Sequence, residues 1–453
     1  MAAALILPAA DWIPCGWWTE VWVVFYGSGV AGMWAVMRAG VVGLFLAGQV
    51  SAGDWPQLLG PQRNGVAAGE VLHRSWPAGG PKVVWEAKVG AGFAGVAVAG
   101  DRVIGFSREG RSEVVRCFSA ADGSVQWEAK AECAYQGGVS SDKGPRCVPL
   151  IADDRVYVLG VEGRLRCLQL QDGRELWQRD TERDFRPLEG YFGVGSTPVL
   201  HAKRLIVNVG GREDASIVAF DTETGKTVWQ VFTDAASYSA PVVVRSGERD
   251  LAIVVTRLHL TGVDIATGKL VFSQPFGARG PTVNGATPVL LGNRILVSSS
   301  YNIGTLLTQL TADGAKEVWR DEELLATQYA TPVPAGKAHP GVVFAMDGRQ
   351  DAGSGSAALK CIDVEARRVL WERAGFDYGS LLRVGDDLLV LTCGGELVRV
   401  SADVGEYREI ARAKVLRATD SGYRLPALAG GHLYVRDDDT LKCLDVGPVG
   451  GRE

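Results

Sequence analysis

The chain has 453 residues, 47% of them hydrophobic and 22% charged, which is the balance of a folded protein and not of a disordered one. Its net charge of -5, without any basic run, argues against nucleic acid as a partner. The 58 glycines and 13 tryptophans favour many short strands joined by tight turns.

The first 52 residues form a leader that differs from the rest of the chain. Two apolar stretches, residues 21–37 and 39–48, are separated only by Arg38. Residues 37–52 are typical of a secretory signal peptide, with a basic residue, an apolar run and a small-x-small cleavage site ending at Ala52. The 36 residues upstream fit a start codon assigned too early. We therefore expect an exported protein, periplasmic or secreted; in the alternative, residues 21–37 are an uncleaved membrane anchor.

A repeat begins after a Gly- and Pro-rich extension, residues 53–82, which is predicted to be draped outside the folded domain. Within residues 83–453 each unit has a strand, a tight turn containing glycine and a second strand that ends in an aromatic residue. The aromatic residues recur 43 to 52 residues apart, and a degenerate copy ends at Tyr407. The regular copies end at Trp127, Trp177, Trp229, Phe272, Trp319 and Trp371.

The first position of the repeat is small, because the aromatic residue packs nearby. Four copies place a cysteine there, and we interpret these cysteines as buried packing residues, not as ligands or nucleophiles. They are Cys117, Cys167, Cys361 and Cys443. Two further cysteines, Cys133 and Cys147, flank one loop at a spacing that allows a disulfide across it.

Two more strands precede each repeat motif, with proline at the entry of the first, as in Thr197-Pro198. Each unit is therefore one four-stranded blade. The last set of strands, which ends at residues 441–445, lacks its fourth strand, and residues 83–89 with Trp85 are a fourth strand without a blade. The sequence predicts an all-β, eight-bladed β-propeller with four-stranded antiparallel blades, the last closed by the N-terminal strand.

The repeat also resembles a known family. The pattern A-x-D-x-x-T-G-x-x-x-W, complete from Ala219 to Trp229, resembles the tryptophan-docking motif of PQQ-type propellers. The start of the extension, residues 54–57, is similar to that of exported bacterial PQQ-binding-like β-propeller repeat proteins. The resemblance implies a propeller over nearly all of the chain after the leader. It also implies a structural docking role for Trp85, Trp127, Trp177, Trp229, Phe272, Trp319 and Trp371.

Two groups of better-known relatives imply different functions. Quinoprotein alcohol dehydrogenases bind pyrroloquinoline quinone (PQQ) and Ca²⁺ on the propeller axis, whereas the propeller subunit of the outer-membrane β-barrel assembly machinery binds proteins. This chain has no adjacent cysteine pair and no C-x-x-C-H haem motif, and no cysteine at the cleavage point for a lipid. We therefore expect a monomeric, non-catalytic binding or scaffold module for a protein, peptide or carbohydrate, without a cofactor. A PQQ- and calcium-dependent dehydrogenase acting on alcohols or sugars is the alternative.

Polar residues near the entry of the inner strands are the candidate ligand site, since inner strands line a propeller axis. The alternative interpretation is that they only satisfy strand ends and ordered water. The five histidines have no metal-binding spacing, and residues 437–439, all aspartate, are interpreted as a solvated turn and not as a Ca²⁺ site. The candidates are Tyr191, Ser196, Tyr238, Ser239, Asn284, Tyr301, Gln328, Tyr329 and Arg349.

Overall fold

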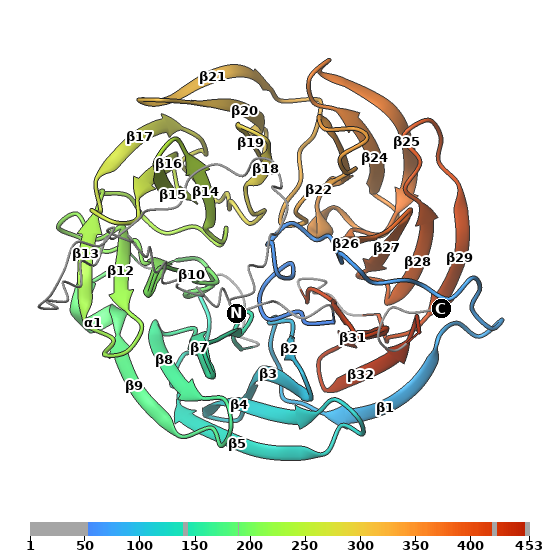
Figure 1. Ribbon diagram of the computed structural model, residues 1–453, viewed down its shortest axis with the longest axis horizontal. Coiled ribbons are helices and arrows are strands. Elements are labelled where there is room, and N and C mark those ends of the chain that lie inside the picture. The colour runs from blue at the N-terminus through green and yellow to red at the C-terminus, as the bar shows by residue number, and fades with distance from the viewer. Residues whose placement is uncertain (1–52, 139–143, 189, 419–423, 449–453) are drawn as a thin grey trace, which may run out of the picture. The chain divides into compact units, whose positions relative to one another are not determined.

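The computed structural model describes residues 53–138, 144–188, 190–418 and 424–448. Within these residues, eight four-stranded antiparallel sheets are arranged as the blades of a ring (Figure 1). The predicted eight-bladed propeller is therefore confirmed. The predicted signal peptide lies outside the described residues. No helix in the described part of the chain is long and apolar enough to span a membrane.

In blades 1 to 7 the four strands follow one another in chain order from the inner to the outer strand. Blade 1 is formed by β2 (Ala97–Ala99), β3 (Arg102–Glu109), β4 (Ser112–Ser119) and β5 (Val125–Glu132), and blade 2 by β6 (Leu150–Ala152), β7 (Arg155–Leu159), β8 (Arg164–Gln169) and β9 (Glu175–Asp180). Blade 3 is formed by β10 (Val199–His201), β11 (Arg204–Asn208), β12 (Ile217–Asp221) and β13 (Thr227–Val231), and blade 4 by β14 (Val242–Ser246), β15 (Arg249–Val255), β16 (His259–Asp264) and β17 (Leu270–Pro275). Blade 5 is formed by β18 (Val289–Leu291), β19 (Arg294–Ser299), β20 (Gly304–Thr311) and β21 (Gly314–Asp321). Blade 6 is formed by β22 (Val333–Pro334), β23 (Val342–Asp347), β24 (Ala357–Asp363) and β25 (Arg368–Phe376), and blade 7 by β26 (Gly379–Val384), β27 (Asp387–Thr392), β28 (Glu396–Ser401) and β29 (Glu409–Lys414). A short helix, α1 (Thr181–Phe185), follows blade 2, and a 3-10 turn, η1 (Gln350–Ala352), lies in blade 6.

Blade 8 is closed by both ends of the chain, as predicted. Its first three strands are β30 (Ala427–Ala429), β31 (His432–Arg436) and β32 (Thr440–Asp445), and the fourth is β1 (Lys82–Lys88). β1 is antiparallel to β32, with Trp85 opposite Cys443. In Figure 1 the blue β1 accordingly lies beside the red β32.

The repeated tryptophans join each blade to the next. Trp177 Nε1 donates to Thr222 O at 2.9 Å, in the turn of the following blade. Gly225 in that turn has φ of 68°, and a Cβ built on it would lie 2.7 Å from the Trp177 ring. Glycine is therefore required there by conformation and by space. Where Arg367 replaces the glycine, its φ is still 50° and its guanidinium lies 5.9 Å from the ring of Trp319.

The assignment of Tyr407 to the last copy of the motif is wrong. In blades 1 and 2 the first motif position pairs with the tryptophan across the sheet, as Cys117 does with Trp127. In blade 7 the corresponding pair is Arg399 with Ala411. Tyr407 precedes β29 and packs edge-on against Trp371 with ring centroids 5.8 Å apart, so it extends an existing aromatic contact.

The extension before β1 does not lie outside the ring, contrary to the prediction. Trp55 is 2% exposed and pairs with Val98 of the inner strand of blade 1. Arg63 is buried and donates to Pro198 O of blade 3 at 3.1 Å, and Ala67 N donates to Arg383 O of blade 7 at 2.9 Å. These contacts reach the inner edges of three blades. The extension therefore runs across the centre of the ring, as the blue trace in Figure 1 shows.

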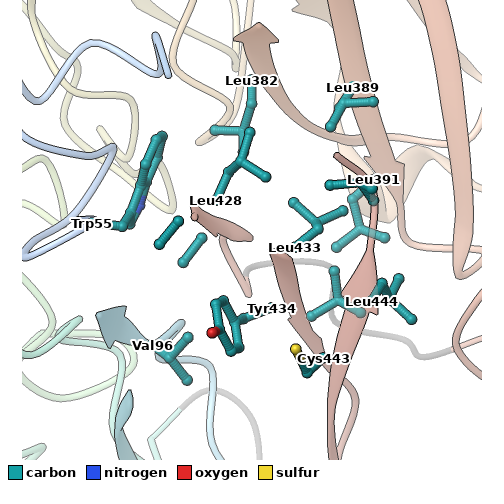
Figure 2. Close-up of a cluster of buried hydrophobic side chains, with 14 of the residues drawn as sticks. Trp55, Val96, Leu382, Leu389, Leu391, Leu428, Leu433, Tyr434, Cys443 and Leu444 are labelled. Carbon is teal, nitrogen blue, oxygen red and sulfur yellow. The ribbon is translucent and has the colours of Figure 1, made fainter. Parts of the chain in front are cut away.

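One buried apolar cluster links the extension to blades 1, 7 and 8. Figure 2 shows Trp55 with Leu382 of blade 7 and Leu428 of blade 8, and Tyr434 with Cys443 deeper in blade 8. Packing of this kind, and not hydrogen bonding alone, holds the closing blade against its neighbours.

The cysteines lie mainly in the core. Cys117, Cys167, Cys361 and Cys443 are fully buried free thiols, each opposite the aromatic residue of its blade. Cys133 and Cys147 are also free, so the disulfide considered from their spacing is not formed in the structure.

Candidate functional site

One face of the propeller carries the connections between blades and the hairpins between second and third strands; we call it the loop face. The antiparallel order of the blades dictates this, because inner strands start and outer strands end on the same side. The turns that receive the tryptophans lie on the opposite face. A ligand site is expected on the face with the longer and more varied loops.

A cavity of about 1070 Å³ lies on the loop face over blades 2 to 4. Its wall is built from residues 187, 188, 190, 191, 193–195, 208–213, 233–238, 257–259, 279, 280 and 282–284, with contributions from blade 2. The wall combines tyrosines, carboxylates, arginines and aliphatic side chains. A cavity of this size with mixed chemistry is large enough for a ligand of several residues.

Three predicted residues meet at this cavity: Tyr191, Tyr238 and Asn284. Tyr191 OH donates to Gly280 O at 2.7 Å, and Tyr238 OH accepts from Phe192 N at 2.8 Å. Burial raises the pKa of Tyr238 to about 12, so it remains a neutral phenol. These contacts tie the loops of three blades together and fix the shape of the cavity.

Ser196 and Ser239 lie beneath the cavity wall and serve the fold. Ser196 Oγ donates to Ser239 O at 2.8 Å, and both residues are at most 1% exposed. In the same way Thr197 Oγ1 accepts from Val148 N at 3.0 Å. Hydroxyl groups at the inner-strand entries therefore satisfy the backbone of the neighbouring blade.

The remaining predicted residues form a separate cluster over blades 5 and 6. Gln328 Nε2 donates to Tyr301 OH at 2.7 Å, and the Arg349 guanidinium lies 4.9 Å from the Tyr301 ring. Tyr329 OH donates to Gln350 Oε1 at 2.8 Å. The nine candidates are thus divided between the cavity, the blade contacts and this cluster, and do not form one ring.

Tyr378 makes the central hydrogen bonds of this second cluster, although no sequence pattern pointed to it. Its hydroxyl lies 2.7 Å from Thr327 Oγ1 and accepts from the backbone N–H groups of residues 328, 329 and 330, each at 2.9 Å. Tyr378 is 2% exposed, and burial raises its pKa to about 12. One side chain therefore sets the backbone that presents Gln328 and Tyr329.

We expect Tyr378→Phe to lower the free energy of unfolding by about 2 kcal/mol, because buried N–H groups lose their acceptor. Urea denaturation measures this loss. Tyr407→Phe is the control, because Tyr407 OH bonds only to exposed Glu409 among the described residues, and its removal should cost under about 0.5 kcal/mol. Equal losses in the two variants would contradict the role assigned to Tyr378.

In blades 1 to 4, the residues that lie four positions before the first residue of the inner strand contact one another near the propeller axis. Arg146 occupies this position in blade 2, Gly195 in blade 3 and Tyr238 in blade 4. A Cβ on Gly195 would lie 2.7 Å from Tyr238 Cδ1 and 3.0 Å from Arg146 Cδ. The Arg146 guanidinium lies 4.5 Å from the ring of Phe93, which holds the same position in blade 1. The common offset from the inner strand was a usable sequence signal for Phe93 and Arg146.

Arginines and aspartates gather where blade 8 meets blade 1. Arg424 donates to Gly92 O at 2.7 Å and pairs with Asp438, and burial lowers its pKa. Arg436 is surrounded by backbone carbonyls, and burial lowers its pKa to about 9. The aspartates of residues 437–439 are partners of arginines here, in the hairpin between β31 and β32.

His259 and Asp234 were not selected from the sequence, yet they form a polar contact in the cavity wall. Asp234 Oδ2 accepts from Thr256 Oγ1 at 2.6 Å and from Leu258 N at 2.8 Å. The same oxygen lies 2.9 Å from His259 Nδ1, and the Asp234 side chain is only 7% exposed. The pair fixes the orientation of the imidazole.

A calcium–quinone centre needs side chains that hold the metal ion. Across residues 53–138, 144–188, 190–418 and 424–448, no three His, Cys, Asp or Glu side chains are grouped closely enough to hold a metal ion. The Asp234 carboxylate already has four hydrogen-bond partners, three on Oδ2 and one on Oδ1. We therefore derive no chemical step through such a centre.

Comparison with known protein families gives a match over most of the chain. The sequence profile of the family described as outer membrane protein assembly factor BamB matches residues 77–212, 111–339 and 213–447, which together cover most of the chain. The chain belongs to this family. The BamB-family assignment agrees with the eight blades and with the repeat found in the sequence.

Individual relatives of this BamB-family chain fall into two groups. BamB from Burkholderia pseudomallei is 23% identical over 56% of this chain and 62% of its own length. Quinohemoprotein alcohol dehydrogenase ADH-IIG from Pseudomonas putida is 30% identical over 27% of this chain and 17% of its own length. The chain thus spans less than two thirds of either relative.

Solved structures show the same fold in both groups. BamB from Moraxella catarrhalis superposes with a TM-score of 0.56 at 16% identity, over 80% of this chain and 96% of that one. Quinohemoprotein alcohol dehydrogenase from Comamonas testosteroni gives 0.60 at 14% identity, over 91% and 83%. At such identities the likeness shows the propeller alone.

Proposed function

We propose that this chain is an exported, non-catalytic propeller that binds a partner protein through its loop face. The observation that carries this proposal is the cavity of about 1070 Å³ over blades 2 to 4. Its wall includes Leu188, whose side chain is 55% exposed, beside tyrosines and charged groups. Exposed aliphatic and aromatic side chains with a polar rim are characteristic of protein interaction sites.

Family membership supports this proposal, because the matching profile is named for a factor that assembles outer-membrane proteins. The predicted signal peptide supports export to the periplasm or beyond. The tryptophan contacts between blades support a rigid scaffold, on which the loop face is held in one shape.

A photoreactive amino acid placed at residue 188 tests this function in the cell. We expect it to form a covalent adduct with a specific protein. The control carries the same group at Val228, which is 44% exposed on the outer strand β13, away from the cavity. Absence of an adduct at position 188, or the same adducts at both positions, would overturn the proposal.

A calorimetric titration with PQQ in the presence of Ca²⁺ tests the alternative function, a quinone-dependent dehydrogenase. We expect no saturable heat of binding and no dye reduction with alcohols or sugars. Stoichiometric binding together with substrate-dependent dye reduction would replace the proposed function.

A further inference from the structure

Two buried carboxamides lie at the floor of the cavity with an unused acceptor each. Asn208 Nδ2 donates to Val255 O at 3.0 Å, and Asn284 Nδ2 donates to Thr256 O at 3.0 Å. Because each amide nitrogen is held by the same backbone segment, each Oδ1 points away from it. Asn208 and Asn284 are 0% and 1% exposed, and neither oxygen has a hydrogen-bond partner among the described residues. A buried acceptor without a donor is costly, so both favour a donor supplied from outside.

His259 adds a third acceptor to the same wall. The Asp234 carboxylate accepts from Leu258 N and Thr256 Oγ1, and its Oδ2 lies 2.9 Å from His259 Nδ1, which places the ring proton on Nδ1. In the neutral imidazole Nε2 is then an acceptor. His259 also packs edge-on against Phe232, with ring centroids 5.2 Å apart, and this restricts the rotation of its ring.

The rest of the wall supplies apolar contact and free donors. Leu188 is exposed in the connection between blades 2 and 3, and the wall continues through Val209 and Leu258. The side chains of Arg212 and Arg279 lie at the rim, exposed, and make no ion pair within the described part of the chain. The cavity therefore has acceptors at its floor, donors at its rim and an apolar side between them.

We propose that this cavity binds an extended peptide segment of the partner, which deepens the proposed function and rests on it. Backbone N–H groups of the segment donate to His259 Nε2, and they reach the oxygens of Asn208 and Asn284 only through ordered water, because these two residues have almost no exposed surface. An apolar side chain packs on Leu188, and backbone or carboxylate oxygens meet the rim arginines. Neutral sugars satisfy acceptors as well, but an exposed leucine in a wall with acceptors, and with arginines unpaired among the described residues, matches a peptide better.

Selection from a display library of random twelve-residue peptides on the immobilised full chain tests the inference. Selected peptides are synthesised, and their affinities are measured by calorimetry. We expect Leu188→Asp and Asn284→Leu each to weaken binding by about tenfold. Val228→Asp is the matched control, because it adds the same charge at an exposed aliphatic residue outside the cavity, and its affinity should be unchanged.

The fold of each variant is checked by its thermal unfolding. If Asn284→Leu is destabilised, Leu188→Asp decides the result, because an exposed side chain does not support the fold. Failure to select any peptide, or equal affinity for Leu188→Asp and the unmodified chain, overturns the inference. Binding of neutral cello-, malto- or chito-oligosaccharides in place of peptides also overturns it. A protein adduct at position 188 without peptide binding would preserve the proposed function and reject only the extended segment.

Discussion

Replacing Trp85 by alanine is expected to lower the free energy of unfolding by about 3–5 kcal/mol, the usual cost of deleting a buried tryptophan side chain. Trp85 is 7% exposed, packs 5.9 Å from the Tyr434 ring and donates through Nε1 to Ala120 O at 2.9 Å. A Cβ on Gly123 would lie 2.6 Å from its ring. One side chain therefore joins the N-terminal strand, blade 8 and blade 1.

We expect the loss of stability to be larger than for the same substitution in another blade, because β1 closes the ring. β1 is the strand through which the N-terminal part of the chain completes blade 8. Weakening it exposes the edge of β32 and opens the ring. Urea denaturation of Trp85→Ala measures the loss, and Val83→Ala on the same strand is the control. Because Val83 is 40% exposed, its replacement should cost less than about 0.5 kcal/mol. A loss below about 1 kcal/mol for Trp85→Ala would contradict the closure argument.

The fold was predictable because its contacts repeat along the chain. Each of blades 1 to 7 has its four strands within about 50 consecutive residues, and the same tryptophan, glycine and proline positions recur at that spacing. The extension escaped prediction because its contacts are single and distant. Arg63 meets Pro198, 135 positions away, and Gly65 lies beneath Val333. Contacts of this kind leave no periodic signal.

The candidate site was predictable only in part, because the residues at the start of the inner strands have one of two roles in the structure. Residues at the inner-strand entries either hydrogen-bond the next blade, as Ser196 does with Ser239, or face the cavity, as Tyr238 does. Their local sequences do not separate the two roles. Asp234 lies in the connection between blades 3 and 4 whereas His259 begins β16, and only the folded chain brings their side chains to 2.9 Å.

Stability is expected to fall as the pH rises above about 9, because buried thiols keep their protons only in the folded state. Burial raises the pKa of Cys361 to about 12 from an ordinary value of 9.0, and Cys117, Cys147 and Cys443 are shifted to the same value. Between pH 9 and 12 the unfolded chain therefore binds fewer protons than the native one, so the free energy of unfolding decreases. Each such thiol contributes about 1.4 kcal/mol per pH unit in this window.

Two buried arginines oppose this effect. Burial lowers the pKa of Arg63 and of Arg436 to about 9, so above that pH they lose protons in the native state while the unfolded chain keeps them. Their contribution rises with pH and offsets that of two thiols. Because the shifted thiols outnumber the two arginines, the net change from these groups is still a loss of stability.

The contribution of one thiol is isolated with Cys361→Ala, since alanine occupies the corresponding position in blade 3, at Ala219. The free energy of unfolding is measured in urea with reductant at pH 8 and pH 10 for the protein and for the variant. All other titrating groups are common to both and cancel. The stability lost between the two pH values should be about 1.4 kcal/mol smaller in Cys361→Ala. Equal losses would show that Cys361 ionises normally, and the buried slot opposite Trp371 would then have to be open to water.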